Sequence, residues 1–167
     1  VRNWDRGVFF KDVTDGIVRN VDGTGNKHAV EFDTTASSTV DGVTASSNVE
    51  YGLYLKDATG SSVVDSTATG NGRDGLFVDG GDATVTRVRT DGNTEHGVHL
   101  KAADGSTVRA VTATGNGLHG VYAGNVADGL VADSTADDNA EAGFRIHHSD
   151  RTLVTNVTAD RNAHGVH

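Results

Sequence analysis

Histidines are the first side chains in this sequence whose type and spacing could support chemistry. Of the eight histidines, His96 and His119 are 23 residues apart, and Asp74 precedes His96 by 22 residues. On neighbouring repeats the two rings could share a divalent metal, with Asp74 as the best third ligand. A zinc site normally has three or four ligands and supporting contacts around them. We favour the alternative interpretation, in which His96 and His119 are exposed turn residues.

Carboxylates could serve a second kind of chemistry, the hydrolysis of glycosides. This reaction needs two carboxyl groups on one face, about 5 to 5.5 Å apart for retention or about 6.5 to 9.5 Å apart for inversion. The best-placed sets are Asp57 with Asp79, and Asp79 with Asp82. Arg145 is the fourth catalytic candidate. It clusters with His147, His148 and Asp150 in the last full coil, and this basic cluster could bind an acidic sugar together with Tyr122.

Aromatic side chains recur at one position of the sequence repeat and form a third candidate site. Stacked along a solenoid, they would offer an exposed platform for sugar rings or for a partner surface. The alternative, which we favour, is that the rings stabilise a sheet face through contacts worth about 0.2 to 1 kcal/mol each. Together with the basic cluster, the residues expected to contact a ligand are Tyr54, Phe77, His99, Tyr122, Arg145 and His147.

A repeat that spans the chain must position all of these candidates. An asparagine returns every 22 or 23 residues, at Asn3, Asn26, Asn48, Asn71, Asn93, Asn116, Asn139 and Asn162. A small residue follows each asparagine by three or four positions and opens a short apolar segment. Self-similarity at a period of twenty-odd residues is typical of a solenoid. We expect the eight asparagines to stack as a ladder inside a turn, helped by their tolerance of left-handed backbone.

Each repeat has the pattern of strands and turns. In the repeat that begins at Gly52, Leu53 and Leu55 flank Tyr54 as in a half-buried strand, and residues 62–66 form a second extended piece. The remaining residues are mostly types that form turns. Equivalent positions are apolar in nearly every repeat, as in the column Val18, Val40, Val63, Val85, Val108, Val131 and Val154. The sequence therefore predicts an all-β parallel solenoid of about seven coils, each of 22 or 23 residues.

One further column carries charge. Lys11, Asp33, Lys56, Asp79 and Lys101 alternate in sign on successive coils. Opposite charges on adjacent strands attract, whereas like charges would repel. We therefore expect these side chains to pair and to help fix the register of the coils.

The pattern of glycine, apolar, any and apolar residue, followed by a turn, a valine strand, a small residue and asparagine, resembles a known family. It is similar to the right-handed parallel β-helix repeat of the pectin-lyase-like superfamily, which includes carbohydrate-binding and sugar-hydrolase β-helix modules. The resemblance covers residues 3–166. It implies the right-handed fold, and it extends to lyases, hydrolases, epimerases, adhesins and tail spikes, so it implies no single activity.

Composition limits the partners and cofactors. The net charge of −9 and the pI of about 5.2 make a nucleic acid an unfavourable partner. The absence of cysteine excludes disulfides and thiolate metal sites. Calcium is a candidate cofactor because the turns are rich in Asp, although no GGxGxD-type repeat is present. The excess of Asp suits either turn formation or a salty habitat. No apolar run approaches the roughly 20 residues that a membrane-spanning helix needs.

Two functional hypotheses follow. The first, which we favour here, is a non-catalytic extracellular or cell-surface β-helix that acts as a spacer and binds a glycan or a partner along the aromatic column. The second is the core of a polysaccharide lyase or glycoside hydrolase that acts on an acidic polysaccharide. The triplet that begins at Asn156 is a possible glycosylation acceptor. Residues 1–167 should form a single domain, as a segment of a longer protein whose coil ends are covered by further chain or by another subunit.

Overall fold

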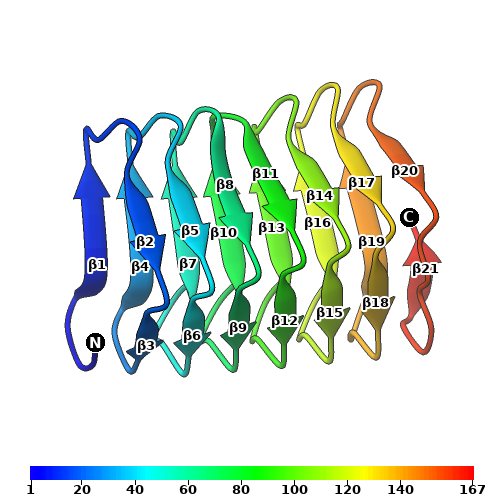
Figure 1. Ribbon diagram of the computed structural model, residues 1–167. Helices are drawn as coiled ribbons and strands as arrows, with labels where there is room; N and C mark the ends of the chain where they lie inside the picture. The colour runs from blue at the N-terminus through cyan, green and yellow to red at the C-terminus, as the bar shows by residue number, and fades with distance from the viewer.

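The computed structural model describes residues 1–167 as a parallel β-helix built only from strands and turns (Figure 1). The coils lie side by side from β1 (Arg6–Lys11) at one end to β21 (His164–Val166) at the other. Since the fold contains no helix, it has none that is long and apolar enough to cross a membrane. The sequence prediction of an all-β solenoid is confirmed.

Three parallel sheets run along the stack of coils. Between β1 and β21, the first sheet contains β4 (His28–Asp33), β7 (Leu53–Lys56), β10 (Leu76–Asp79), β13 (Val98–Lys101), β16 (Val121–Gly124) and β19 (Ala142–His147). The second sheet contains β2 (Ile17–Arg19), β5 (Thr39–Asp41), β8 (Ser61–Val64), β11 (Ala83–Thr86), β14 (Thr107–Arg109), β17 (Leu130–Ala132) and β20 (Leu153–Thr155). The third sheet contains β3 (Asp22–Thr24), β6 (Thr44–Ser46), β9 (Thr67–Thr69), β12 (Arg89–Asp91), β15 (Thr112–Thr114) and β18 (Thr135–Asp137).

The third sheet corrects the expectation of two strands in each coil. The segment Thr67–Thr69 was expected to be part of a turn, but it forms β9 and pairs with β6 and β12. Its only buried residue is Ala68. A strand with one inward side chain has no alternation of apolar and polar residues, which is why its sequence resembles a turn.

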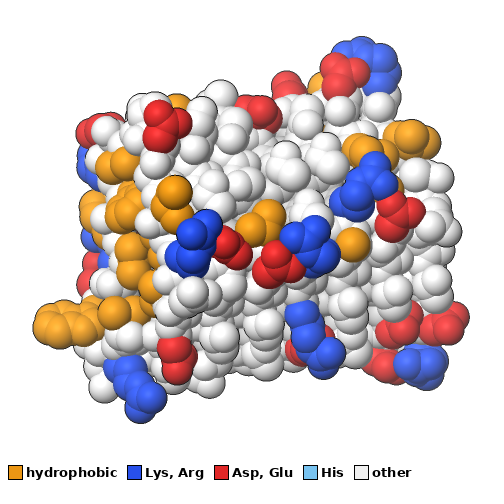
Figure 2. Space-filling view, viewed as in Figure 1, with side chains coloured by type: hydrophobic (Ala, Val, Ile, Leu, Met, Phe, Trp, Pro, Cys, Tyr) orange, Lys and Arg blue, Asp and Glu red, His pale blue; other side chains and the backbone are white.

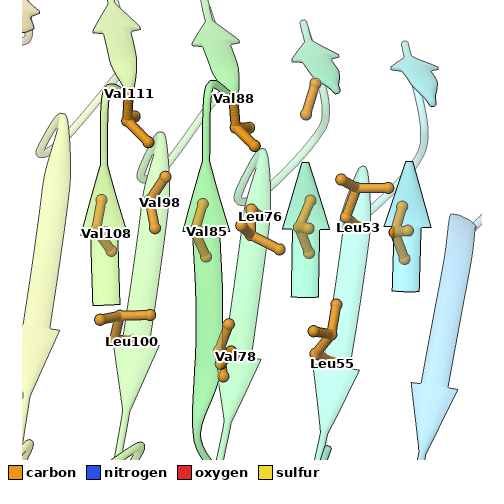
Figure 3. Close-up of a cluster of buried hydrophobic side chains, with 14 of the residues drawn as sticks. Leu53, Leu55, Leu76, Val78, Val85, Val88, Val98, Leu100, Val108 and Val111 are labelled. Carbon is orange, nitrogen blue, oxygen red and sulfur yellow. The ribbon is translucent and has the colours of Figure 1, made fainter. Parts of the chain in front are cut away.

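The core is made of columns of identical or similar side chains, as the sequence predicts. Val63, Val85 and Val108 are in register on adjacent strands of the second sheet, and each is fully buried. Figure 3 shows how such residues repeat from coil to coil between the sheets. Because the strands are parallel and about 4.8 Å apart, each side chain packs on its equivalent in the next coil.

Seven of the eight repeated asparagines form a ladder from Asn26 to Asn162, and all of them except Asn162 are buried. In its centre, Asn93 donates from its backbone N and its Nδ2 to Asn116 Oδ1, over 3.1 and 3.0 Å. Asn3 is not part of the ladder. The left-handed residue is the one before each ladder asparagine, such as Gly92 with φ of 59°. The asparagine therefore acts through its side-chain amide, and not through the left-handed backbone that we expected.

The alternating charge column pairs as predicted. Asp33 lies between two lysines, 3.7 Å from Lys11 Nζ and 3.2 Å from Lys56 Nζ, and Asp79 lies 3.1 Å from Lys101 Nζ. Further pairs cover the face shown in Figure 2, where lysine and arginine side chains lie beside aspartate and glutamate. Elsewhere in the chain, Arg87 Nε lies 2.6 Å from Asp65 Oδ1. A lysine or arginine without a carboxylate partner is therefore the exception in this protein.

Candidate functional site

The candidate site lies where two outward columns meet on the first sheet. In each coil, the small residue and the apolar residue after it both face the interior. The side chain of the residue before this pair and that of the residue after it therefore both lie on the outer side of the sheet. We call these the leading column and the trailing column. The leading column includes His28, Tyr51, Asp74, His96 and His119. The trailing column includes Tyr54, Phe77, His99, Tyr122 and Arg145.

The expectation that His96 and His119 are exposed turn residues is wrong. His96 is 8% exposed and His119 is 5% exposed. Tyr122 stacks on both rings, with centroid distances of 5.0 Å to His96 and 5.6 Å to His119. The trailing column therefore covers the leading column. Sequence spacing alone did not reveal this, because it gives the register along a column and not the contact between two columns.

The aromatic residues form a cluster and not a flat exposed ribbon. Tyr54 and Phe77 stack with centroids 5.3 Å apart, and Tyr51 from the leading column packs 5.0 Å from each of them. As a result, Phe77 is only 6% exposed. Burial raises the pKa of both Tyr51 and Tyr54 to about 12. Tyr51 was not among the sequence candidates, and its place before Gly52 was the available signal.

A groove of about 580 Å³ opens next to this cluster, over β13, β16 and β19. It is lined by His96, His99, Lys101, His119, Tyr122, Gly124, Asn125, Glu141 and Arg145. The structure thus brings together three of the expected ligand-binding residues, His99, Tyr122 and Arg145. The other three, Tyr54, Phe77 and His147, do not line it.

Beneath the groove, Asp74 holds two histidines. Its Oδ2 is 3.1 Å from His99 Nδ1, and its Oδ1 accepts the backbone N–H of His96 at 2.9 Å. Asp74 is 1% exposed. A carboxylate only accepts hydrogen bonds, so it places the proton of neutral His99 on Nδ1 and leaves a lone pair on Nε2. Asp74 and His99 therefore form a pair suited to general-base catalysis.

His96 and His119 have the opposite arrangement. The backbone N–H of His119 donates to His96 Nδ1 at 3.3 Å, and that of Ala142 donates to His119 Nδ1 at 3.1 Å. Burial lowers the pKa of His96 to about 4 and also lowers the pKa of His119. The two rings are therefore neutral near pH 7. His119 Nε2 lies 3.3 Å from Glu141 Oε2 at the edge of the groove.

The residues best placed for a metal are Asp74, His96 and His99, whose ligand atoms lie within 4.8 Å of one another. His119, which the sequence suggested as a partner of His96, is not in this group. The lone pair of neutral His96 is on Nδ1 and already accepts a backbone N–H. Metal binding through its Nε2 would require that hydrogen bond to break, so the set is a poor match to a three-ligand site.

Arg145 is an exception to the charge pairing of the surface. Every lysine and arginine other than Arg2 and Arg145 has a carboxylate oxygen within 4 Å. Arg145 lines the groove, half-buried, and is the in-register neighbour of Tyr122. Its guanidinium has the charge and the N–H donors that a carboxylate can accept from.

The three aspartates considered for hydrolysis lie outside the groove. Asp79 pairs with Lys101, and Asp82 accepts the backbone N–H of Gly60 at 2.7 Å. Asp57 occupies a left-handed turn position with φ of 48°. Glu141 is the single carboxylate in the groove lining. Hydrolysis by a pair of carboxyl groups therefore has no matching arrangement there.

Comparison with known proteins gives a family and a fold. The model of the family "Right handed beta helix region" matches residues 28–167. A search of curated proteins gives no match. Among solved structures, the periplasmic alginate epimerase AlgG has 16% sequence identity and a TM-score of 0.68, and covers 96% of this chain. A double mutant of AlgG has 18% identity and a TM-score of 0.84 over 88% of this chain.

The A-module of the mannuronan C-5 epimerase AlgE4 from Azotobacter vinelandii is also similar. It has 13% identity and a TM-score of 0.60, and the match covers 97% of this chain. The aligned part is 49% of AlgG, 36% of its double mutant and 56% of the AlgE4 module. The chain thus spans about a third to a half of these structures. At such identities the likeness is one of fold.

Proposed function

We propose that this chain, which belongs to the right-handed β-helix region family, acts on an acidic polysaccharide. In this proposal it removes the proton from the carbon next to a uronate carboxylate. The observation that carries the proposal is the Asp74–His99 pair, in which His99 lines the groove that also holds the unpaired Arg145. A base and a carboxylate-binding cation are the two groups that this chemistry needs.

Arg145 would bind the uronate carboxylate and neutralise it. Neutralisation makes the hydrogen on the adjacent carbon more acidic, because the electrons left after its removal spread into the carboxylate. His99 then takes this proton on Nε2, while Asp74 holds the ring and stabilises the imidazolium that forms. In-register pairing puts Tyr122 on the strand between His99 and Arg145. Its hydroxyl would donate the proton that the sugar takes up.

Removal of the proton leaves a carbanion that the neighbouring carboxylate stabilises, and two products are possible from it. Return of a proton to the opposite face of the sugar gives the epimer, and loss of the glycosidic oxygen gives an unsaturated uronate. The fold neighbours support the first, since their names describe epimerases of alginate and mannuronan. The periplasmic location in the name of AlgG supports a site of action outside the cytoplasm.

Deuterium exchange tests the shared first step. We would incubate the protein in D₂O with alginate, polygalacturonate or neutral cellulose oligomers and follow the sugars by NMR, with absorbance for unsaturated products. Deuterium should enter the uronates, next to the carboxylate, and His99→Gln should abolish its entry. Asp79→Asn is the matched control outside the groove and should retain exchange. No exchange and no products with either uronate polymer would contradict the proposal.

A second candidate is the non-catalytic, glycan-binding spacer. The observation in its favour is the near-constant coil of 22 or 23 residues, without long loops to close over a substrate. Binding of acidic oligomers without exchange, retained in His99→Gln and lost in Arg145→Gln, would favour this candidate over the enzyme.

A further inference from the structure

We infer that His96 binds the carboxylate of the ligand as a neutral hydrogen-bond donor, with its proton held on Nε2 by a backbone hydrogen bond to Nδ1. This inference rests on the proposed function for the class of ligand, a uronate chain, but it does not depend on turnover. It assigns to His96 a role in specificity that differs from the role of its neighbour His99.

The leading column shows how the proton is fixed. In it, the backbone N–H of one coil donates to the side chain of the preceding coil. The donor–acceptor pairs are Tyr51 N to His28 Nδ1, His96 N to Asp74 Oδ1, His119 N to His96 Nδ1, and Ala142 N to His119 Nδ1. Aspartate and histidine serve equally because each supplies an acceptor atom at the same place. The hydrogen bond is thus part of the coil geometry and does not depend on a ligand.

This hydrogen bond determines the tautomer of His96. A neutral imidazole has one N–H and one lone pair, so a ring whose Nδ1 accepts must carry its proton on Nε2. Protonation of Nδ1 would turn two N–H groups toward each other. Burial acts in the same direction and lowers the pKa, as do His99, His119 and Arg145, whereas Asp74 raises it. The ring therefore stays a neutral donor over the usual pH range.

The Nε2–H of His96 is available to a ligand. His96 lines the groove, and no protein atom accepts a hydrogen bond from its Nε2. The equivalent nitrogen of His119 faces Glu141, and that of His28 lies 3.8 Å from Glu31. Of the three rings, only that of His96 has no carboxylate oxygen within 4 Å of Nε2. A carboxylate of the ligand can take this place.

The position of Arg145 suggests how the carboxylate is shared. Tyr122 stacks on His96, and Arg145 is in register with Tyr122 on the next strand. A carboxylate has two oxygens, so it can accept from a guanidinium and from an imidazole N–H at once. A neutral sugar lacks the acceptor charge that makes both bonds strong. His96 would therefore contribute to the preference for acidic over neutral chains.

The test combines NMR with binding. Long-range ¹H–¹⁵N spectra of histidine-labelled protein from pH 5 to 8 should show His96 protonated on Nε2 throughout. Titration with oligogalacturonate or alginate oligomers should shift the His96 Nε2–H signal, and neutral cellulose oligomers should not. His96→Ala should weaken binding of the acidic oligomers about tenfold or more, since a hydrogen bond to a charged group is lost. His96→Gln, which keeps a donor, should restore most of the affinity.

His28→Ala is the matched control, because His28 makes the same Nδ1 hydrogen bond but lies outside the groove. It should bind like the wild type. A proton on His96 Nδ1, or unchanged affinity in His96→Ala, would overturn the inference. Deuterium exchange with unchanged affinity in His96→Ala would reject this role and leave the proposed function intact. An affinity that depends on His96, without any deuterium exchange, would support this role of His96 and contradict the proposed catalytic function.

Discussion

His96 and His99 are neighbours with opposite hydrogen-bonding roles. Their ring centroids are 4.9 Å apart and their planes are at 80° to each other. His96 Nδ1 accepts a backbone N–H, whereas His99 Nδ1 faces the Asp74 carboxylate. The proton of the neutral first ring is therefore on Nε2, whereas Nε2 of the neutral second ring carries the lone pair. One groove thus contains a donor and a base of the same residue type.

Asp74→Asn tests the base. The amide oxygen can still accept the backbone N–H of His96, which turns the amide NH₂ toward His99 Nδ1 and moves the proton of that ring to Nε2. Loss of a general base should lower turnover by a factor of about 10² to 10⁴. The fold should remain, as judged by circular dichroism. Turnover equal to that of the wild type would show that Asp74 does not set the state of His99.

Arg145→Gln tests the cation. Because Arg145 has no ion-pair partner within the protein, its loss should change the free energy of unfolding by less than about 0.5 kcal/mol. The affinity for acidic oligomers should fall about tenfold or more, and the dependence of binding on salt should weaken. Arg109→Gln is the control that should bind normally, because Arg109 lies on β14 of the second sheet and pairs with Asp133. Equal losses in both variants would indicate a general effect of charge.

Asn93→Ala tests the ladder. The change removes the hydrogen bonds from Nδ2 to Ala68 O and to Asn116 Oδ1, and leaves donors of Asn71 without their acceptor. Unsatisfied buried groups cost about 1 to 3 kcal/mol each. The free energy of unfolding measured by urea denaturation should therefore fall by about 3 kcal/mol or more. Asn3→Ala, outside the ladder, should cost only about 1 kcal/mol, because it removes no ladder hydrogen bond and places alanine at a φ of 59°. Equal and small losses would show that the ladder contributes little.

Two glycines of one coil should differ in how well they tolerate substitution by a larger residue. A Cβ at Gly97 would lie 2.6 Å from Gly120 O and 2.5 Å from Thr90 Oγ1, so Gly97→Ala should cost about 3 kcal/mol or more. Gly92 has no atom within 4 Å of such a Cβ and only needs a left-handed backbone. Gly92→Asn should cost less than about 1 kcal/mol. Thermal melts of the two variants would compare these costs, and the reverse order would contradict this account.

The buried histidines should make stability depend on pH. The pKa of His96 in the folded protein is about 4, below its ordinary value of 6.5, so the unfolded chain binds more protons between these values. Stability should thus be complete above about pH 6.5 and fall as the pH is lowered toward 4. One pKa unit corresponds to about 1.4 kcal/mol, so the free energy of unfolding should fall by a few kcal/mol at most. Melting temperatures of His96→Gln should fall less over this window than those of the wild type. An equal fall would assign the effect to other groups.

The sequence alone determined the repeat and most of its consequences. The spacing of asparagines, the valine columns and the paired charges from Lys11 to Lys101 all follow from one rule, that equivalent residues of parallel coils lie side by side. Any feature within a single column was therefore predictable. The strand Thr67–Thr69 was not predicted, because a strand with a single inward residue shows no alternation of apolar and polar residues.

The tertiary structure decided what happens between columns. Asp74 meets His99 across 25 residues because the small residue and the apolar residue after it both point inward, which brings the leading and trailing columns onto one face. The same bend buries His96 and His119 under Tyr122 and directs a backbone N–H at each Nδ1. Proton positions depend on these contacts and on burial. Neither is encoded in the period of the sequence, so the roles of the histidines could only come from the fold.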